Sequence, residues 1–383
     1  MVRSGRLPSA ILFLLFVGLI PPGVLCAAPG ASAGSGEQPL ATFSDATSEW
    51  GTGVEGIIEN AYRQCFRTYI VSGKVLTLRM PFAQDEERSE LTDQELTVTG
   101  NGKADPGLLW SLVDQALASA DFQSYVSALE DGREKLVTYN LQNRSWTAIA
   151  DWYQIDWMKA GVYLGLPHLI NVLAKGRGIT APEIYNYLYS VSRVGMDCSG
   201  FVWWVLKSVG RAGGVDLDAT FRRYLGAPSI ATVPLYVGAW FFDPRNTNLE
   251  VVKDEVRNIR PGDVIAFRGA DGTIVHSAVI QSVNLPTGTI RYMQSTDEAP
   301  QDQRGVHEST VTFDPARPEL SLKDPSLVWQ QRNAPPFVGE TDSGYRNDGE
   351  RYRAHQDLGG GVVVRIKALK PAMDKLRVSA PLK

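Results

Sequence analysis

The chain has 383 residues, of which 44% are hydrophobic and 21% charged, and its formal net charge at pH 7 is −4. These values are those of an ordinary globular protein that is long enough for more than one domain. The modest charge and the lack of a long basic run exclude a nucleic-acid-binding protein. The sequence has no ligand cluster with metal spacing, so we expect neither a metal nor a cofactor.

The N-terminus has the pattern of an export signal. Two arginines precede an apolar run over residues 10–20, and small residues follow near Cys26. The run is shorter than the ~20 residues that a membrane span needs. We therefore predict a signal peptide over residues 1–27, no transmembrane segment in the mature chain, and export to the periplasm or the cell exterior. A lipid anchor at Cys26 is the alternative, ranked second because Leu25 stands where lipoprotein signals usually carry a small residue.

Residues 28–50 are small, polar and rich in glycine and proline, which predicts a flexible linker. The region 51–145 mixes helix and strand patterns, and its role cannot be read. Its clearest element is a helix that begins after Asp105, a natural N-cap, with Pro106 in the first turn. Residues 146–176 are rich in Trp, Tyr and Leu and are expected to form packed helices.

The segment DCSGFVWWVLKSVG, residues 197–210, predicts a helix with a cysteine in its first turn. Apolar residues recur at helical spacing after Cys198, Asp197 can cap the helix, and Gly210 can end it. The unpaired N–H groups and the dipole of a helix start favour a thiolate and can hold a developing oxyanion. The alternative is a small core residue, because cysteine is among the residue types most often buried.

One of the four histidines lies in a setting that suits a catalytic base. Residues 264–267 and 274–280 predict two strands joined by a turn, and His276 lies on the second strand. The residues expected on the same strand face as His276 are Ile274, Ala278 and Ile280. A histidine satisfied within the sheet is the alternative. The histidines not expected to be catalytic are His168, His307 and His355.

The following segment, GTIRYMQSTDE, predicts a third strand on which Ile290, Tyr292 and Gln294 share a face. A polar side chain on a neighbouring strand can orient an imidazole and fix its tautomer. Gln294 fits that role, although glutamine on a half-exposed strand is also ordinary.

Four motifs in this order resemble the NlpC-type cell-wall cysteine peptidases over about residues 150–315. They are DCSGFV at 197–202, RPGDVIAF at 260–267, HSAVI at 276–280 and YMQST at 292–296. The resemblance implies a papain-like α+β fold, in which the helix that bears the cysteine packs on an antiparallel sheet. It implies a catalytic domain over residues 146–320, after a mixed α/β N-terminal region and before a C-terminal extension over residues 321–383.

The resemblance also implies roles for single residues. Cys198 would be the nucleophile, His276 the general base and Gln294 the third member of the triad. Tyr187 or Tyr189 would shape the substrate pocket. Two residues that flank the cysteine, Asp197 and Ser199, are further candidates for substrate contacts. The substrate and partner implied are peptidoglycan or its peptide fragments, cut by an endopeptidase.

The chain departs from this pattern in three respects. The usual glycine-rich entry before the cysteine is replaced by YNYLYSVSRVGM, residues 55–145 contain no familiar wall-binding module, and the catalytic pair is widely spaced. Cys198 and His276 are 276 − 198 = 78 positions apart, which points to an insertion over residues 225–252 that forms a lid or a substrate wall.

Two other functions stay open: an amidase or acyltransferase of the same fold on another substrate, and a non-catalytic exported scaffold. A Cys65–Cys198 disulfide would silence the enzyme.

Overall fold

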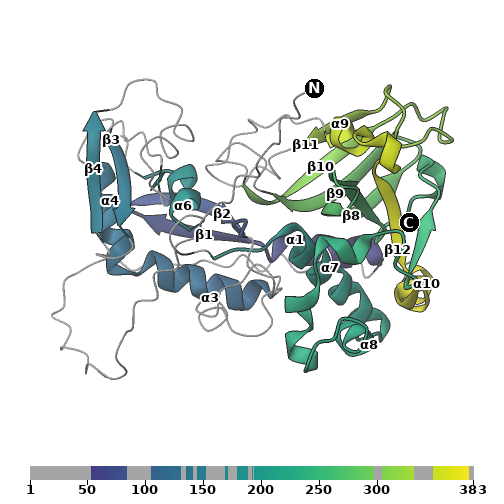
Figure 1. The fold of residues 1–383 in the computed structure, drawn as a ribbon, viewed down its shortest axis with the longest axis horizontal. Helices are drawn as coiled ribbons and strands as arrows, with labels where there is room; N and C mark the ends of the chain where they lie inside the picture. The colour runs from purple at the N-terminus through teal and green to yellow at the C-terminus, as the bar shows by residue number, and fades with distance from the viewer. Residues whose placement is uncertain are drawn as a thin grey trace, which may run out of the picture. The chain divides into compact units, whose positions relative to one another are not determined.

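The structure is a computed structural model, shown in Figure 1. The residues it describes are 53–83, 105–130, 135–140, 145–151, 169–170, 179–188, 192, 194–296, 304–331 and 348–378. All of them belong to the second of two compact units, residues 38–383. The predicted signal peptide, the linker and Cys26 lie outside the described residues.

The protein is mixed α+β with antiparallel sheets, as the sequence predicts. Its largest sheet has seven strands in the order β11-β10-β9-β8-β7-β12-β6, and each neighbouring pair is antiparallel. The strands are β6 Leu249–Val252, β7 Val264–Arg268, β8 Ile274–Asn284, β9 Thr289–Thr296, β10 Gly305–Thr312, β11 Val328–Gln331 and β12 Val362–Ile366. The three predicted strands that surround His276 and Gln294 are β7, β8 and β9.

The sheet continues beyond residue 320, the expected end of the catalytic domain. β12 lies between β7 and β6, and β11 forms one edge. A buried ion pair fastens β12 in place: Arg365 Nε and Nη2 donate to the two carboxylate oxygens of Asp263 over 2.6 and 2.8 Å. The C-terminal extension is therefore part of the same core as the predicted catalytic strands.

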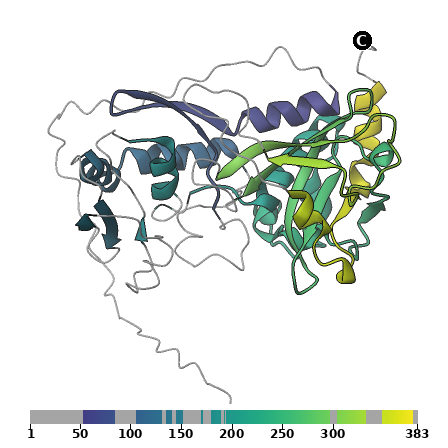
Figure 2. The ribbon, with the colours of Figure 1, turned by 90° about the horizontal axis from the view of Figure 1, so that it is seen from above.

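Helix α7, Cys198–Gly213, packs against β8 and β9, and α1, Val54–Arg63, and α10, Lys370–Val378, pack against α7. Figure 2 shows α1 beside the sheet. The predicted stop at Gly210 is wrong: the helix ends at Gly213, and its C-cap, Gly214, has a left-handed φ of 85°. Gly210 lies inside the helix, where a Cβ would meet the Val215 carbonyl oxygen at 2.6 Å.

The two faces of the sheet contribute to two separate apolar clusters, because side chains alternate along each strand. The α7 face gives sheet residues to the first cluster, among them Val264, Ala266, Val279 and Met293. The opposite face gives sheet residues to the second cluster, among them Ile265, Phe267, Ala278, Ile280 and Tyr292. Helix α9, Asp348–Arg353, contacts β7 and β11 and adds Tyr352 to the second cluster.

The N-terminal region contains helices and short sheets. Asp105 caps α3 as predicted, because its carboxylate accepts from the Gly107 and Leu108 N–H groups. The elements are β1 Phe66–Val71 paired with β2 Lys74–Arg79, α3 Pro106–Leu117, α4 Ala120–Glu130, α6 Ala181–Tyr187, and a three-stranded sheet of β3 Lys135–Asn140, β4 Ser145–Asp151 and β5 Leu169–Ile170.

The packed helices expected over residues 146–176 are wrong where the structure describes them. Residues 145–151 form β4, and residues 169–170 form β5. The segment SWTAIAD contains aromatic and β-branched residues that favour a strand, and antiparallel pairing with β3 satisfies its backbone. The rest of the segment lies outside the described residues.

The predicted insertion over residues 225–252 consists of two 3₁₀ helices, η2 Ile230–Tyr236 and η3 Ala239–Phe242, followed by β6. Its Phe241 is fully buried and packs edge-on against Trp203 of α7, with ring centroids 5.4 Å apart. η3 contacts β7 and β8. The insertion is therefore anchored next to the strand that carries His276, and a role as a lid stays a prediction.

Candidate active site

The start of α7 is fixed by Asp197, the predicted N-cap. Its Oδ1 accepts from the Gly200 N–H over 2.5 Å, and the Ser199 hydroxyl donates to Oδ2 over 2.8 Å. The Ser199 hydroxyl also lies 3.2 Å from the carbonyl oxygen of Val237, in the insertion. Cys198 is thus the first residue of the helix. Asp197 and Ser199 are buried in these contacts, and substrate roles for them stay predictions.

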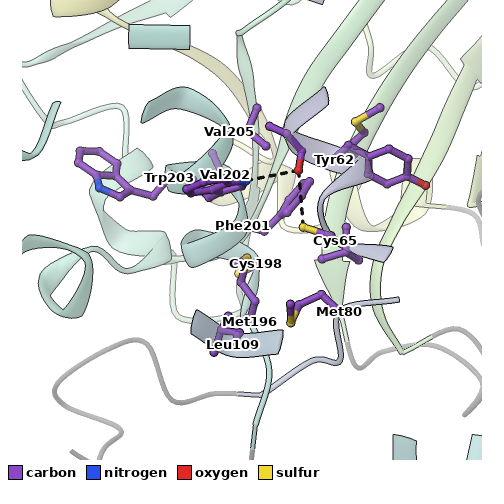
Figure 3. Close-up of a cluster of buried hydrophobic side chains, with 14 of the residues drawn as sticks. Tyr62, Cys65, Met80, Leu109, Met196, Cys198, Phe201, Val202, Trp203 and Val205 are labelled. Carbon is purple, nitrogen blue, oxygen red and sulfur yellow. Dashed lines mark hydrogen bonds between the residues drawn. The ribbon is translucent and has the colours of Figure 1, made fainter. Parts of the chain in front are cut away.

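The Cys198 thiol is enclosed by the first apolar cluster, and only 8% of the residue is exposed. Figure 3 shows it beside Met196 and Phe201. Burial raises the pKa of the thiol well above its usual range, and the charge of Asp197 acts in the same direction. The Ser277 N–H group, the Arg351 charge and the Ser277 hydroxyl lower that pKa by smaller amounts. In this closed arrangement the neutral thiol is favoured.

Cys65 is a second buried thiol in the same cluster. Its sulfur donates to the Ala61 carbonyl oxygen over 3.8 Å, and burial alone raises its pKa. Both Cys65 and Cys198 are free cysteines, so the structure contains no disulfide between them. Cys65 is therefore a natural comparison for Cys198, because it shares the burial without a helix start or a nearby cation that lowers its pKa.

His276 is the third residue of β8 and is only 4% exposed. The expectation that Ile274 shares its face is wrong. The register of β7 and β8 shifts between Phe267, which pairs with His276, and Arg268, which pairs with Ile274. This β-bulge interrupts the alternation, so Ile274 joins the first cluster, whereas Ala278 joins the second.

The structure brings His276 and Gln294 together as the sequence suggests. His276 Nε2 and Gln294 Oε1 are 2.6 Å apart, and Gln294 is 1% exposed. The imidazole also packs against the ring of Phe267, with centroids 5.2 Å apart. An imidazole held by both a hydrogen bond and a ring contact has a fixed orientation.

Cys198, the first residue of α7, lies close to the start of β8, the strand that carries His276. Its sulfur interacts with Ser277, the residue that follows His276 in the strand. The guanidinium of Arg351 lies over the Phe267 ring, 5.4 Å from its centroid, and its charge also acts on the Cys198 thiol. Helix α9 therefore supplies a charge that acts on the thiol and packs on Phe267, the ring that contacts the imidazole. Within the described residues, His276 and Gln294 are in direct contact. His276 pairs in register with Phe267 of the second cluster, whereas Cys198 lies in the first cluster, so a catalytic pairing of Cys198 with His276 stays a prediction.

A residue that sequence reasoning missed completes this arrangement. Asp348, the first residue of α9, is 2% exposed, and its Oδ2 accepts from Gln294 Nε2 over 2.7 Å and from the Tyr292 hydroxyl over 2.8 Å. Asp348 lies within a segment with the composition of an exposed loop, so no local pattern marks it. The only signal was the strand pattern after it, GVVVRIKAL, which indicates that the extension returns to the sheet.

Of the two tyrosines expected at the substrate pocket, only Tyr187 lies within the described residues. Tyr187 is buried, stacks on Tyr125 with centroids 5.4 Å apart, and its hydroxyl lies 3.0 Å from Ser119 Oγ. These contacts place it among α3, α4 and α6, and its pocket role stays a prediction. Tyr189 lies outside the described residues.

The other histidines fall in different settings. His307 on β10 is fully buried, pairs in register with Gln294, and donates from Nδ1 to the Gly305 carbonyl oxygen over 3.0 Å. His355 is the N-cap of a 3₁₀ turn after α9, with a left-handed φ of 55°. His168 lies outside the described residues.

Within the described ranges, no three His, Cys, Asp or Glu side chains are grouped so that they could hold a metal ion. The helices of the same ranges include none with the length and apolar character to cross a membrane. Comparison with known proteins finds no matching family model, no matching curated protein and no matching solved structure.

Proposed function

We propose that this chain is an exported cysteine hydrolase with a papain-like catalytic domain, which cleaves amide bonds in the peptide stems of peptidoglycan. The observation that carries the reaction type is the 2.6 Å contact between His276 Nε2 and Gln294 Oε1. The next residue of the strand, Ser277, acts to lower the pKa of the Cys198 thiol. The substrate rests on the motif resemblance alone.

In the proposed reaction, His276 removes the proton from the Cys198 thiol, and the thiolate sulfur attacks an amide carbonyl carbon. N–H groups of the first turn of α7 stabilise the resulting oxyanion, apart from that of Gly200, which donates to Asp197. The imidazolium then protonates the leaving amine, and a thioester remains on Cys198. His276 next activates a water molecule, which hydrolyses the thioester and releases the acid.

A second candidate is a non-catalytic exported protein on the same fold. The observation that favours it is the burial of both groups, with Cys198 8% and His276 4% exposed, and the raised pKa of the thiol. A catalytic site with this closed form has to open for substrate, whereas a scaffold has no such need. Thiol reactivity separates the two candidates.

The experiment incubates purified peptidoglycan fragments with the wild type and with Cys198→Ala, and identifies new amino and carboxyl ends by mass spectrometry. We expect cleavage by the wild type and a loss of at least about 10³-fold in Cys198→Ala, because the nucleophile is removed. Cys65→Ser is the matched control, since it alters the other buried thiol and is expected to stay active.

Equal cleavage by the wild type and Cys198→Ala contradicts the proposed mechanism. The position of the cut bond distinguishes an endopeptidase from an amidase of the same fold. A wild type that cuts no fragment, and whose Cys198 reacts as slowly as Cys65 with a thiol reagent, supports the non-catalytic candidate.

A further inference from the structure

A hydrogen-bonded chain of buried polar groups begins at His276 and ends on α9. Gln294 Oε1 faces His276 Nε2 at 2.6 Å, while Gln294 Nε2 donates to Asp348 Oδ2 over 2.7 Å and to Ser309 Oγ over 3.2 Å. The Tyr292 hydroxyl donates to the same Asp348 oxygen over 2.8 Å. The members lie on β8, β9, β10 and α9, and each is buried. Figure 1 shows α9 close to β11.

One member of the chain differs from the rest in what it can do. Histidine, glutamine, serine and tyrosine side chains can each donate and accept hydrogen bonds. An ionised carboxylate only accepts. Asp348 is therefore the one group among these five that determines which partner donates and which accepts in the hydrogen bonds of the network.

Asp348 sets the position of the His276 proton in two steps, through the orientation of the Gln294 amide. The carboxylate of Asp348 requires the amide NH₂ of Gln294 to point toward it, so the amide carbonyl oxygen points toward His276. A carbonyl oxygen only accepts, so His276 carries its proton on Nε2, and Nδ1 keeps the lone pair. In the neutral imidazole, Nδ1 is then the nitrogen that can take a proton.

We infer that Asp348 is a positioning residue that fixes the tautomer of His276 through the amide of Gln294. Its consequence for catalysis rests on the proposed function, because Nδ1 is the atom that would remove the thiol proton. Reversal of the tautomer would turn the Gln294 carbonyl oxygen toward the carboxylate. A hydrogen bond to a charged group would be lost, which is a factor of about 10 to 100 in the tautomer equilibrium.

The variant Asp348→Asn tests this role of Asp348 directly. Asparagine has nearly the same shape as aspartate, but its side chain can donate as well as accept hydrogen bonds. An amide at position 348 can face Gln294 with either its oxygen or its NH₂ group, and Ser309 and Tyr292 can follow either arrangement. Long-range ¹H–¹⁵N correlation spectra of protein with ¹⁵N-labelled histidine report the tautomer, and His276→Gln assigns the signal. The spectra are taken well above pH ~6.5, where an ordinary imidazole is neutral.

We expect at least about ten parts Nε2–H tautomer to one of Nδ1–H in the wild type, and a ratio within about threefold of unity in Asp348→Asn. Glu350→Gln, on the exposed side of α9, removes the same charge and should leave the tautomer unchanged. Tyr292→Phe keeps the carboxylate and should also leave it unchanged. If cleavage is measurable, kcat should fall by at most about fourfold in Asp348→Asn with little change in KM, in proportion to the lost share of the Nε2–H tautomer.

An Nδ1–H tautomer in the wild type overturns the inference, as does an undiminished Nε2–H preference in Asp348→Asn. A scrambled tautomer in Tyr292→Phe also overturns it, because the whole network would then matter more than the carboxylate. The spectra need no substrate. The tautomer result can therefore hold even if peptidoglycan fragments are never cleaved, and it can fail while cleavage is observed.

Discussion

Cys198 and His276 lie at the same end of β8, but their surroundings are opposite in kind. The thiol is enclosed by apolar side chains such as Met196 and Phe201, and burial raises its pKa. The imidazole lies in a polar network in which both ends of the Gln294 amide are hydrogen-bonded. A bulge in β8 separates the apolar packing of Ile274 from the polar position of His276.

In the proposed mechanism, this difference would keep the base in a fixed orientation while the nucleophile stays neutral. Buried polar groups are stable only when they are hydrogen-bonded, and here the bonds also set the direction of the imidazole. A buried thiol needs no such partner, because its neutral form behaves as a small hydrophobic group. The imidazole is thus held in one orientation, whereas catalysis at the thiol would require the site to open and the thiol proton to be removed.

The largest change in the cleavage rate is expected when the imidazole of His276 is removed. His276→Ala should lower the cleavage rate by about 10²- to 10⁴-fold, because the general base is lost. His307→Ala is the matched control, since His307 is an equally buried histidine on β10. Steady-state rates per folded molecule give the comparison. Similar losses in both variants would show that the effect is structural.

The next largest effect is expected at Gln294. Gln294→Leu removes the bond to His276 and leaves Asp348 without one of its donors, so we expect a loss of about 1–3 kcal/mol in unfolding free energy. The cleavage rate should fall by about tenfold or more, because the imidazole loses the hydrogen bond that holds both its orientation and its tautomer. Urea unfolding and rate measurements check both.

Gln281→Leu is the control for that experiment. Gln281 is buried on β8 and bonds to the Glu55 carbonyl oxygen and to Arg291, away from His276. It should lose stability and keep its rate per folded molecule. A Gln294→Leu variant with the full wild-type rate would contradict the role given to Gln294.

The two buried thiols should affect how the unfolding free energy depends on pH. Burial raises the pKa of both Cys198 and Cys65 above the unfolded value of about 8.5. Below that value both states keep the thiol proton, and above it the unfolded state loses the proton first. The unfolding free energy should therefore fall by about 1 kcal/mol for each thiol between pH ~8.5 and ~9.5. Alanine at both positions should flatten this fall, and an unchanged slope would show that the thiols are not protected.

The smallest effect is expected from Tyr292→Phe. The substitution removes one of the two bonds to Asp348 Oδ2 and keeps the ring packed against Trp329, 5.6 Å away. We expect a loss of about 1 kcal/mol in unfolding free energy and at most a few-fold change in rate. Thermal unfolding measures the first. A rate loss as large as that of His276→Ala would place Tyr292 itself in the chemistry.

Local patterns were enough to predict the elements that carry the candidate site. The N-cap at Asp197, the helix that starts at Cys198, and the strands of His276 and Gln294 all follow from residues near them in sequence. The contact between His276 and Gln294 was also accessible, because neighbouring strands of a meander pair predictably.

Long-range features were not accessible in the same way. The insertion of β12 beside β7 and the approach of Asp348 to Gln294 depend on a chain reversal of more than fifty residues, which no local pattern encodes. The bulge near His276 was missed because a run of alternating residues looks regular in sequence. Cys198 is buried in a cluster that also contains residues of α1 and β2, which lie far from it in the chain.

The central claim is that the imidazole of His276 activates the Cys198 thiol, and its most direct test is the rate of thiol alkylation at neutral pH. Cys65 is the internal standard, because burial raises its pKa without an opposing group. The account predicts that Cys198 reacts at least about tenfold faster than Cys65 and that His276→Ala removes this difference. Equal rates for the two thiols in the wild type, or a Cys198 rate that His276→Ala leaves unchanged, would contradict it.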